Sequence, residues 1–455
     1  MLLERRDALL TALFGAGHIG LRALATGLPA WFLANPRLAS AEALDCAIMA
    51  KEKLQYLILS TSSAGDPLNC NVPGTYEAPA IIHPNQATMA ATMVNLGGKS
   101  FGAALPWAST DVGGALAAAT LSRTAFFHHT TRSTTHGDQP KVMKLLGAMT
   151  GGEMVVSAFA KHLSGCFGTV QPEPVAVGAR GNSSELLSYA GRTLPSVSPT
   201  QLKQLLTGSK TDALVKMRTM RDQSLDQLNA MFKNEGTTVQ KQFLDAMALS
   251  QVQVRKLVEQ LATTLNAINA DDTKGQALAA AALISANVTP VVTMHIPFGG
   301  DNHTDTDLAA EAAQHVTGVQ AIQQVQDALA MLNLTDKVTF ATLNVFGRNL
   351  NGIAKTDGRA GRDHYGNHAV TVMIGKNVKP GVYGGVATGS SAAFLASAID
   401  SATGAPNASG DIPVAQTHVS AMRTLGVSLG IPEGDMATDF TAMAGGKVVK
   451  AAVTV

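Results

Sequence analysis

The run Leu54-Gln-Tyr-Leu-Ile-Leu-Ser60 is a short, mostly apolar segment that ends in a turn rich in Ser, Thr and Gly. Such a run, bounded by turn residues, is typical of a strand that is buried on both faces. Strands of this kind belong to parallel sheets that helices cover on both sides. We therefore expect residues 54–60 to lie inside the sheet of an α/β protein.

Similar runs recur along the chain and alternate with helical patterns. Strands are predicted at residues 124–128, 288–296, 337–343 and 369–374, and helices at residues 141–149, 308–332 and 417–425. This alternation predicts an α/β fold with a mostly parallel central sheet and helices on both faces.

A different pattern interrupts this domain, which we expect to cover residues 42–455. Apolar side chains recur there at helical spacing, at Leu202, Leu205, Leu206, Phe243, Met247, Val252, Leu257 and Leu261. The pattern predicts a helical hairpin inserted in the domain at residues 197–285, with its apolar stripe as core.

The composition excludes some classes of protein. Among 455 residues, 34 are Lys or Arg and 33 are Asp or Glu, so the formal net charge is +1. A general nucleic-acid-binding protein would be clearly basic, so we expect no nucleic-acid partner. The chain has three cysteines, which allow at most one disulfide and no disulfide framework.

The N-terminal residues 1–41 have the pattern of an export signal. Arg5 and Arg6 precede a moderately apolar stretch, and Ala39-Ser40-Ala41 fits the small-residue pattern of a cleavage site. The segment resembles a twin-arginine (Tat) leader, which predicts a periplasmic or cell-surface location. The alternative is an amphipathic helix that stays on the protein.

Candidate metal ligands follow the predicted strands. In open α/β sheets, ligands bind beyond the carboxyl ends of the strands. Six of the twelve histidines lie in or beside these loops: His128, His129, His136, His303, His364 and His368. Carboxylate and imidazole groups both coordinate zinc or manganese.

Two clusters of Asp and His stand out among these loops. Asp301 and His303 follow the strand at 288–296, and Asp363, His364 and His368 follow the strand at 337–343. Converging clusters would form a two-metal site suited to hydrolysis of a phosphate or sulfate ester. The alternative for each Asp–His pair is a hydrogen-bonded turn. The nearby Arg348, Arg359 and Arg362 are either anion-binding groups or solvated loop charges.

Several motifs together resemble one bacterial family. They are Val338-Thr-Phe-Ala-Thr-Leu-Asn-Val-Phe-Gly-Arg348, Gly361-Arg-Asp-His-Tyr-Gly-Asn-His368, Val378-Lys-Pro-Gly-Val-Tyr-Gly-Gly385, Gly300-Asp-Asn-His303, Ala64-Gly-Asp-Pro-Leu-Asn69 and the loop at residues 130–137. The chain is similar in these segments, and in its Tat-like leader, to the domain of unknown function 1501 (DUF1501) family. That family belongs to the alkaline-phosphatase/sulfatase-like superfamily.

The resemblance implies roles for individual residues. Asp66, Asp363 and His364 would hold one divalent metal ion (zinc, manganese or calcium). Asp301, His303 and His368 would hold a second, for which His418 is either a competing ligand or a core histidine. Ser133, Thr134 and Thr135 are the candidate nucleophiles near a helix start, and Arg348 is the candidate catalytic arginine.

The sequence departs from the family at one position that bears on function. Val345 stands where the family has an acidic residue before Phe-Gly-Arg. Two functions therefore remain: an exported metal-dependent hydrolase of small phosphate or sulfate esters, or a catalytically inactive phosphatase-like protein that does not require the metal. The second would have a structural, assembly or binding role at the cell surface, with self-association or a protein partner docking through the helical insertion. A carbohydrate- or lipid-binding module is a third interpretation, with little support from Trp31 and Trp107.

Overall fold

The computed structural model describes residues 51–76, 80–178, 187–207, 261–351, 361–388 and 394–454, with single positions at 220, 223, 224 and 227. The chain divides into two compact units, one of residues 1–42 and 199–270 and one of residues 43–198 and 271–455. Among the described helices, none has the length and apolar character that a membrane span requires. The predicted leader at 1–41 lies outside the described residues.

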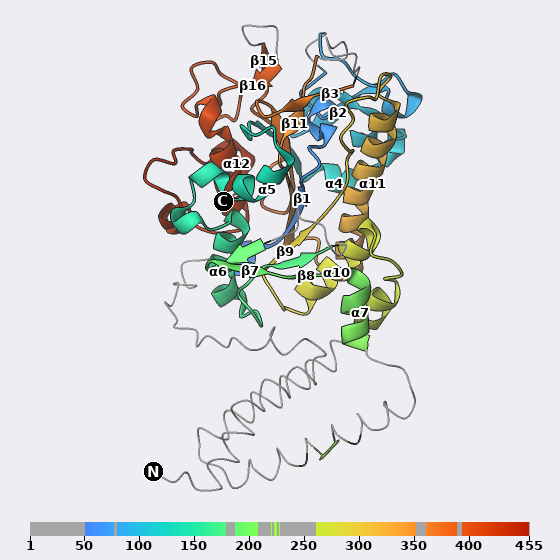
Figure 1. Cartoon of the computed structure of the whole chain (residues 1–455), viewed down its shortest axis with the longest axis vertical. Helices are drawn as coiled ribbons and strands as arrows, with labels where there is room; N and C mark the ends of the chain where they lie inside the picture. Colours follow the sequence, from blue (N-terminus) through green and yellow to red (C-terminus); the bar gives the residue numbers. More distant parts are fainter. Residues whose placement is uncertain are drawn as a thin grey trace. The chain divides into compact units, whose positions relative to one another are not determined.

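The second unit is built on an eight-stranded sheet (Figure 1). In spatial order its strands are β14 (Gly381–Tyr383), β4 (Thr124–His129), β13 (Ala369–Ile374), β10 (Val338–Asn344), β1 (Tyr56–Ser62), β9 (Val291–Met294), β5 (Val175–Val177) and β8 (Ser196–Val197). The pairs β10–β1, β1–β9, β9–β5, β5–β8 and β14–β4 are parallel, and only β13 runs against its two neighbours in this sheet. The prediction of a mostly parallel central sheet is therefore confirmed.

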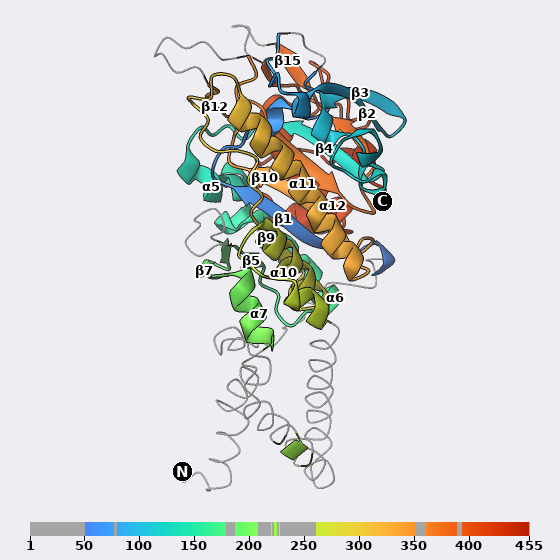
Figure 2. The same cartoon turned by 90° about the vertical axis from the view of Figure 1, so that its right-hand side faces the viewer.

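Helices flank the sheet (Figures 1 and 2). On one side lie α10 (Thr273–Ser285) and α11 (Ala309–Met331), which pack against each other. On the other lie α6 (Val155–Phe167) and α12 (Thr417–Ser428). The shorter helices are α4 (Ala118–Leu121), α5 (Gln139–Met143) and α13 (Glu433–Met436). Outside the main sheet, the strands pair in twos: β2 (Ala91–Leu96) with β3 (Lys99–Ala104), β6 (Leu187–Tyr189) with β7 (Arg192–Leu194), β11 (Gly347–Arg348) with β12 (His364–Tyr365), and β15 (Val386–Thr388) with β16 (Phe394–Ala396).

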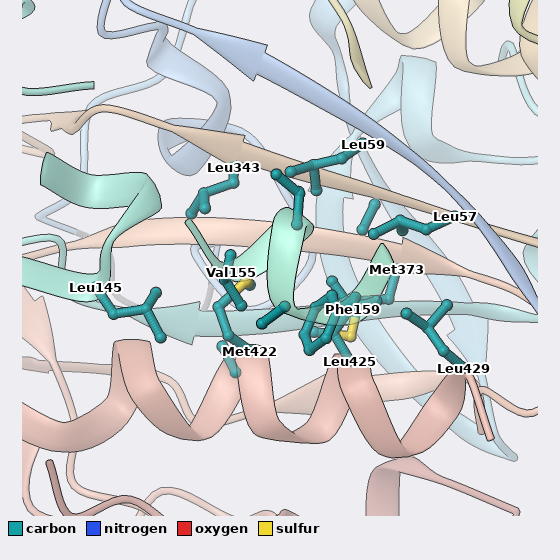
Figure 3. Close-up of a cluster of buried hydrophobic side chains, with 14 of the residues drawn as sticks. Leu57, Leu59, Leu145, Val155, Phe159, Leu343, Met373, Met422, Leu425 and Leu429 are labelled. Carbon is teal, nitrogen blue, oxygen red and sulfur yellow. The ribbon is translucent and has the colours of Figure 1, made fainter. Parts of the chain in front are cut away.

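The main apolar core lies between the sheet and α12 (Figure 3). Leu57 and Leu59 alternate along β1 and both point to this side, where Phe159, Met422 and Leu425 meet them. All five side chains are almost completely buried. Removal of each of these side chains from water contributes about 1.5–3 kcal/mol to the stability of the fold. This packing fixes β1, and with it the loop that follows β1.

The predicted helices agree with the structure in part. The helices predicted at 308–332 and 417–425 are α11 and α12. The helix predicted at 141–149 is only α5, because Leu145 and Leu146 have φ of 50° and 57° and cannot continue a right-handed helix. Of the predicted insertion at 197–285, α7 (Pro199–Thr207) is helical and α10 packs on β9, while most of residues 208–260 lie outside the described residues.

Candidate functional site

The loops that carry the predicted ligands leave the same edge of the sheet. β1, β4, β9 and β10 are oriented alike, so their carboxyl ends share this edge. β13 runs the other way, so the segment that precedes it, residues 361–368, also lies there. Antiparallel pairing of β11 with β12 sets His364 opposite Arg348. The topology thus brings together residues that are far apart in sequence.

One oxygen of Asp301 is the centre of a cluster of basic groups. Asp301 Oδ1 lies 2.8 Å from Nε2 of His303, 2.9 Å from Nε2 of His364 and 3.8 Å from Nε2 of His136. The guanidinium of Arg348 donates to the same oxygen at 3.1 Å. Burial by itself raises the pKa of Asp301, but hydrogen bonds from His364 and Arg348 and the charge of Arg348 outweigh it and lower this pKa to about 2. Asp301 is therefore an ionised acceptor.

The other nitrogen of each imidazole lies close to an oxygen atom of a neighbouring loop. His136 Nδ1 lies 2.6 Å from the carbonyl oxygen of Ser63, and His364 Nδ1 lies 2.8 Å from that of Thr134. His303 Nδ1 lies 3.2 Å from Oδ1 of Asp363. Carbonyl oxygens only accept, so Nδ1 of His136 and Nδ1 of His364 each carry a proton, and Nε2 is the nitrogen left to hold a further proton or a cation next to Asp301.

This arrangement gathers acceptors around one point. The lone pairs at Nε2 and the Asp301 carboxylate face one another, and such groups repel unless a cation or a further proton lies among them. The ligand atoms of His136, Asp301 and His364 all lie within 4.8 Å of one another, which makes this triad a candidate metal site. Imidazole rings held by outer acceptors, together with a carboxylate, match the ligand sets of zinc and manganese.

An aromatic ring completes the wall behind the two histidines. Phe346 is fully buried and packs on His364 and His136, with ring centroids 4.4 and 5.1 Å apart. Gly65 allows this contact, since a Cβ there would lie 1.7 Å from the Phe346 ring. Phe346 therefore restricts both imidazoles to the orientation in which Nε2 points at Asp301.

The structure groups the predicted ligands differently from the two sets implied by the resemblance. Asp301, His303 and His364 lie together, and Asp363 lies behind His303, with its Oδ1 3.2 Å from Nδ1 of that ring. His136 joins the triad although the sequence assigned it no role. Its signals were its place in the polar loop after β4 and the resemblance of residues 130–137 to a loop of the family.

Asp66 is buried beneath this edge of the sheet. Its side chain is 1% exposed, and neither carboxylate oxygen makes a hydrogen bond of good geometry within the described residues. Burial raises the pKa of Asp66 to about 7, although Ser62, the charge of Arg348 and the backbone of Phe298 act in the opposite direction. Asp66 is not part of the triad, yet an unbonded buried carboxylate is a group that a cation or proton would satisfy.

His368 lies in a separate buried network. Its Nδ1 lies 3.1 Å from the amide nitrogen of Asn69, and its Nε2 lies 3.0 Å from Nδ1 of His128. Burial and the neighbouring histidines hold the pKa of His368 well below its usual value. His418 is also a buried histidine and stacks on His129 on the α12 side of the sheet.

Arg348 is a buried clamp between loops. Its side chain is completely inaccessible to solvent, and it donates from Nε to the Gly65 carbonyl at 2.6 Å. One terminal nitrogen donates to the carbonyls of Ala64 and Gly300 at 3.2 and 3.1 Å, as well as to Asp301. Arg348 thus ties the loops after β1 and β9 together, a contact set different from that of a solvated loop charge.

The three candidate nucleophiles precede a short helical turn, η7 (His136–Asp138), and then α5. Ser133 is buried, and its hydroxyl donates to Asp138 Oδ2 at 2.9 Å and accepts from the Thr135 amide at 3.2 Å. Thr134 and Thr135 are exposed. The Thr134 carbonyl is the group that orients His364, so these hydroxyls lie beside the triad in the chain.

Comparison with known proteins identifies one family. A family model described as "Protein of unknown function (DUF1501)" matches residues 134–398, a range that contains His136, Asp301 and His364. A search of curated proteins gave no match. Because the match covers more than half of the 455 residues, the chain belongs to the DUF1501 family.

Proposed function

We propose that this protein is an exported, metal-dependent hydrolase of phosphate or sulfate esters with an alkaline-phosphatase-like architecture. The observation that carries the proposal is the convergence of imidazole Nε2 atoms on Asp301 Oδ1, with each Nδ1 directed at an acceptor. A mostly parallel sheet with the cluster at its carboxyl edge supports the same class of site.

The proposed centre holds one divalent cation at His136, Asp301 and His364, with His303 beside them. Nitrogen ligands favour zinc or manganese over calcium, which prefers oxygen. When bound, such a cation supplies Lewis-acid stabilisation of the negative charge that develops on an ester oxygen.

The remaining roles belong to the protein's own groups. The carbonyls of Ser63 and Thr134 accept from Nδ1 of His136 and His364, which fixes the proton at that nitrogen of these two rings, and the Asp363 carboxylate lies beside Nδ1 of His303. Thr134 and Thr135 offer exposed hydroxyls beside the cluster, whereas the hydroxyl of Ser133 is already bonded to Asp138. We therefore favour Thr134 or Thr135 as the nucleophile, with backbone N–H groups of the following turn near the anionic ester.

Export is supported by one feature of the fold besides the leader pattern. Cys166 is disulfide-bonded, while Cys70 is a buried free thiol. Disulfides persist mainly in oxidising compartments such as the periplasm. Reaction of the denatured, unreduced protein with a thiol reagent should label Cys70 and leave Cys166 unlabelled, and labelling of Cys166 would remove this support.

A second function is favoured by the burial of the arginines. Arg348 and Arg362 belong to the arginine set for which the sequence left anion binding or a solvated loop charge open, and both are completely buried and bonded to backbone carbonyls or carboxylates. Because these two described arginines are used inside the protein, the arrangement fits a phosphatase-like protein whose role is structural or binding. In this alternative the cation, where bound, stabilises the loops.

Turnover assays separate the two functions. The protein is reconstituted with zinc or manganese and assayed with p-nitrophenyl phosphate and p-nitrophenyl sulfate, alongside Asp301→Asn and the control Asp307→Asn. Asp307 is an exposed carboxylate in the same loop, so its change leaves the cluster intact. Metal-dependent hydrolysis that Asp301→Asn abolishes and Asp307→Asn retains supports the hydrolase. Metal binding without hydrolysis of either ester, or of a wider phosphate and sulfate ester panel, favours the structural role.

A further inference from the structure

A fully buried ion pair lies immediately behind the candidate metal site. Arg362 Nε lies 2.6 Å from Oε2 of Glu311, and both side chains are completely inaccessible to solvent. Glu311 belongs to the first turn of α11, and Arg362 directly precedes Asp363 and His364 in the chain. We propose that the Glu311–Arg362 pair is the positioning device that sets Asp363 and His364 for metal binding.

The pair joins four separate segments of the chain. Arg362 donates to the carbonyls of Asn349 and Leu350 at 2.9 and 3.3 Å, and also to that of Ile82. The second oxygen of Glu311 accepts from the amide of Asn71 at 2.8 Å. The side chain of Arg362 therefore fixes its segment to α11, to the residues that follow β11 and to the loops after β1.

Glu311 is itself held in place. Its backbone N–H donates to Oδ2 of Asp305 at 2.8 Å, so the start of α11 is fixed to the loop that carries Asp301 and His303. One rigid helix end thus connects the Asp301 loop with the His364 segment. A shift of the ion pair would alter the distance between the two halves of the cluster.

Close backbone packing transmits this position to the ligands. The Gly361 N–H donates to the His303 carbonyl at 2.9 Å, and a Cβ on Gly361 would lie 1.9 Å from the carbonyl oxygen of Asn302. On the other side, the Asp363 N–H donates to Oδ1 of Asn349 at 2.8 Å. Segment 361–364 is therefore held at both ends, with Arg362 as its buried anchor.

Stability alone is a weak reason for such a pair. Removing two charges from water is costly, and apolar residues of similar volume often replace buried ion pairs with no loss of stability. A role in positioning predicts that an apolar replacement disturbs metal binding more than folding. This proposal rests on the metal site of the proposed function, and its test therefore includes a measurement without metal.

The experiment compares the double variant Glu311→Met/Arg362→Met with wild type and with Met422→Ala. Met422 is a buried core residue on α12, remote in the fold from this segment, and its truncation provides a matched loss of stability. Zinc affinity is measured by competition with a chromophoric chelator. Nitrogen-15 spectra of histidine-labelled, metal-free protein report whether His364 keeps its proton at Nδ1.

The expected result is a fall in zinc affinity of about 10–100-fold in the double variant, as is typical for loss of an outer positioning group. The Nδ1–H signature of His364 is expected to be lost as well, while Met422→Ala keeps wild-type affinity and signature. Wild-type affinity and an unchanged His364 signature in the double variant would overturn the proposal. If wild-type protein binds no zinc, the proposed metal site fails, and the metal-free spectra alone decide whether the pair positions His364.

Discussion

Nε2 of His303 lies 3.0 Å from Nε2 of His364. The two rings come from loops on different strands, and each directs its Nδ1 at an acceptor, Asp363 or the Thr134 carbonyl. Unless a proton lies between them, two imidazole lone pairs at this distance repel, and the Asp301 carboxylate beside them adds a third acceptor. A cation among these groups would remove the repulsion, and the predictions below follow from this geometry.

Asp363→Asn tests whether this carboxylate binds metal directly or through His303. Asp363 lies behind His303, so its loss should weaken zinc binding by about 10–100-fold and leave the number of bound ions unchanged at saturation. Chelator competition gives the affinity, and elemental analysis at saturating zinc gives the number. A smaller number of bound zinc ions at saturation would show that Asp363 is a ligand.

A buried histidine that stays neutral in the native state makes the free energy of unfolding depend on pH. Burial lowers the pKa of His418 to about 4, and neither ring nitrogen has a hydrogen-bond partner among the described residues. Between pH 6.5 and 4 the unfolded chain binds a proton at this position and the native chain does not, so stability falls as the pH falls. His418→Leu should remove this contribution. We expect its free energy of unfolding relative to wild type to rise by roughly 2–3 kcal/mol from pH 7 to pH 4 in urea titrations. An equal difference at both pH values would argue against a neutral buried His418.

Asp66 has the opposite pH dependence. Its native pKa of about 7 lies above that of an unfolded aspartate, so the native state holds the proton between about pH 4 and 7. Stability is therefore lost as the pH rises through this window. In metal-free protein, the free energy of unfolding of Asp66→Asn relative to wild type should rise by up to about 4 kcal/mol between pH 4 and pH 8. Unfolding titrations at the two pH values measure this, and a constant difference would show that Asp66 ionises normally.

Gly361→Ala tests the close contact between the two ligand-bearing loops. Its Cβ would meet the Asn302 carbonyl oxygen at 1.9 Å, so one loop must move. We expect a loss of about 1–3 kcal/mol in stability together with weaker zinc binding. Gly165→Ala in α6 is the matched control, because nothing lies within 4 Å of the place that its new methyl group would take. If zinc binding weakens equally in both variants, the weaker binding of Gly361→Ala does not come from the loop contact.

The sequence predicts the sheet well where strands are long and buried. All seven residues of β10 and all six of β13 are buried, and their β-branched and apolar runs were recognisable. β5 and β8 have only three and two residues, too few for a periodic pattern to appear. The break at Leu145 and Leu146 arises from backbone conformation that apolar spacing does not encode.

The sequence also predicts which edge of the sheet holds the site, because the ligands follow strand ends. It does not predict the grouping of ligands, since His136 meets Asp301 only through tertiary packing of loops that lie 165 positions apart in the chain. Nor does it predict that Arg348 and Arg362 are completely buried. A charged residue in a polar loop has the same appearance in sequence whether it faces solvent or anchors the loop from within.

The most direct test of the proposed metal centre is the metal content of the purified protein by elemental mass spectrometry. Protein reconstituted with zinc or manganese and freed of excess metal is compared with Asp301→Asn/His364→Ala and with the control Asp307→Asn. We predict about one equivalent of metal in wild type and in Asp307→Asn, because the described residues form a single triad, and none in the double variant. Wild-type protein that retains no metal after reconstitution, or a double variant that retains the full equivalent, would contradict a metal centre at Asp301.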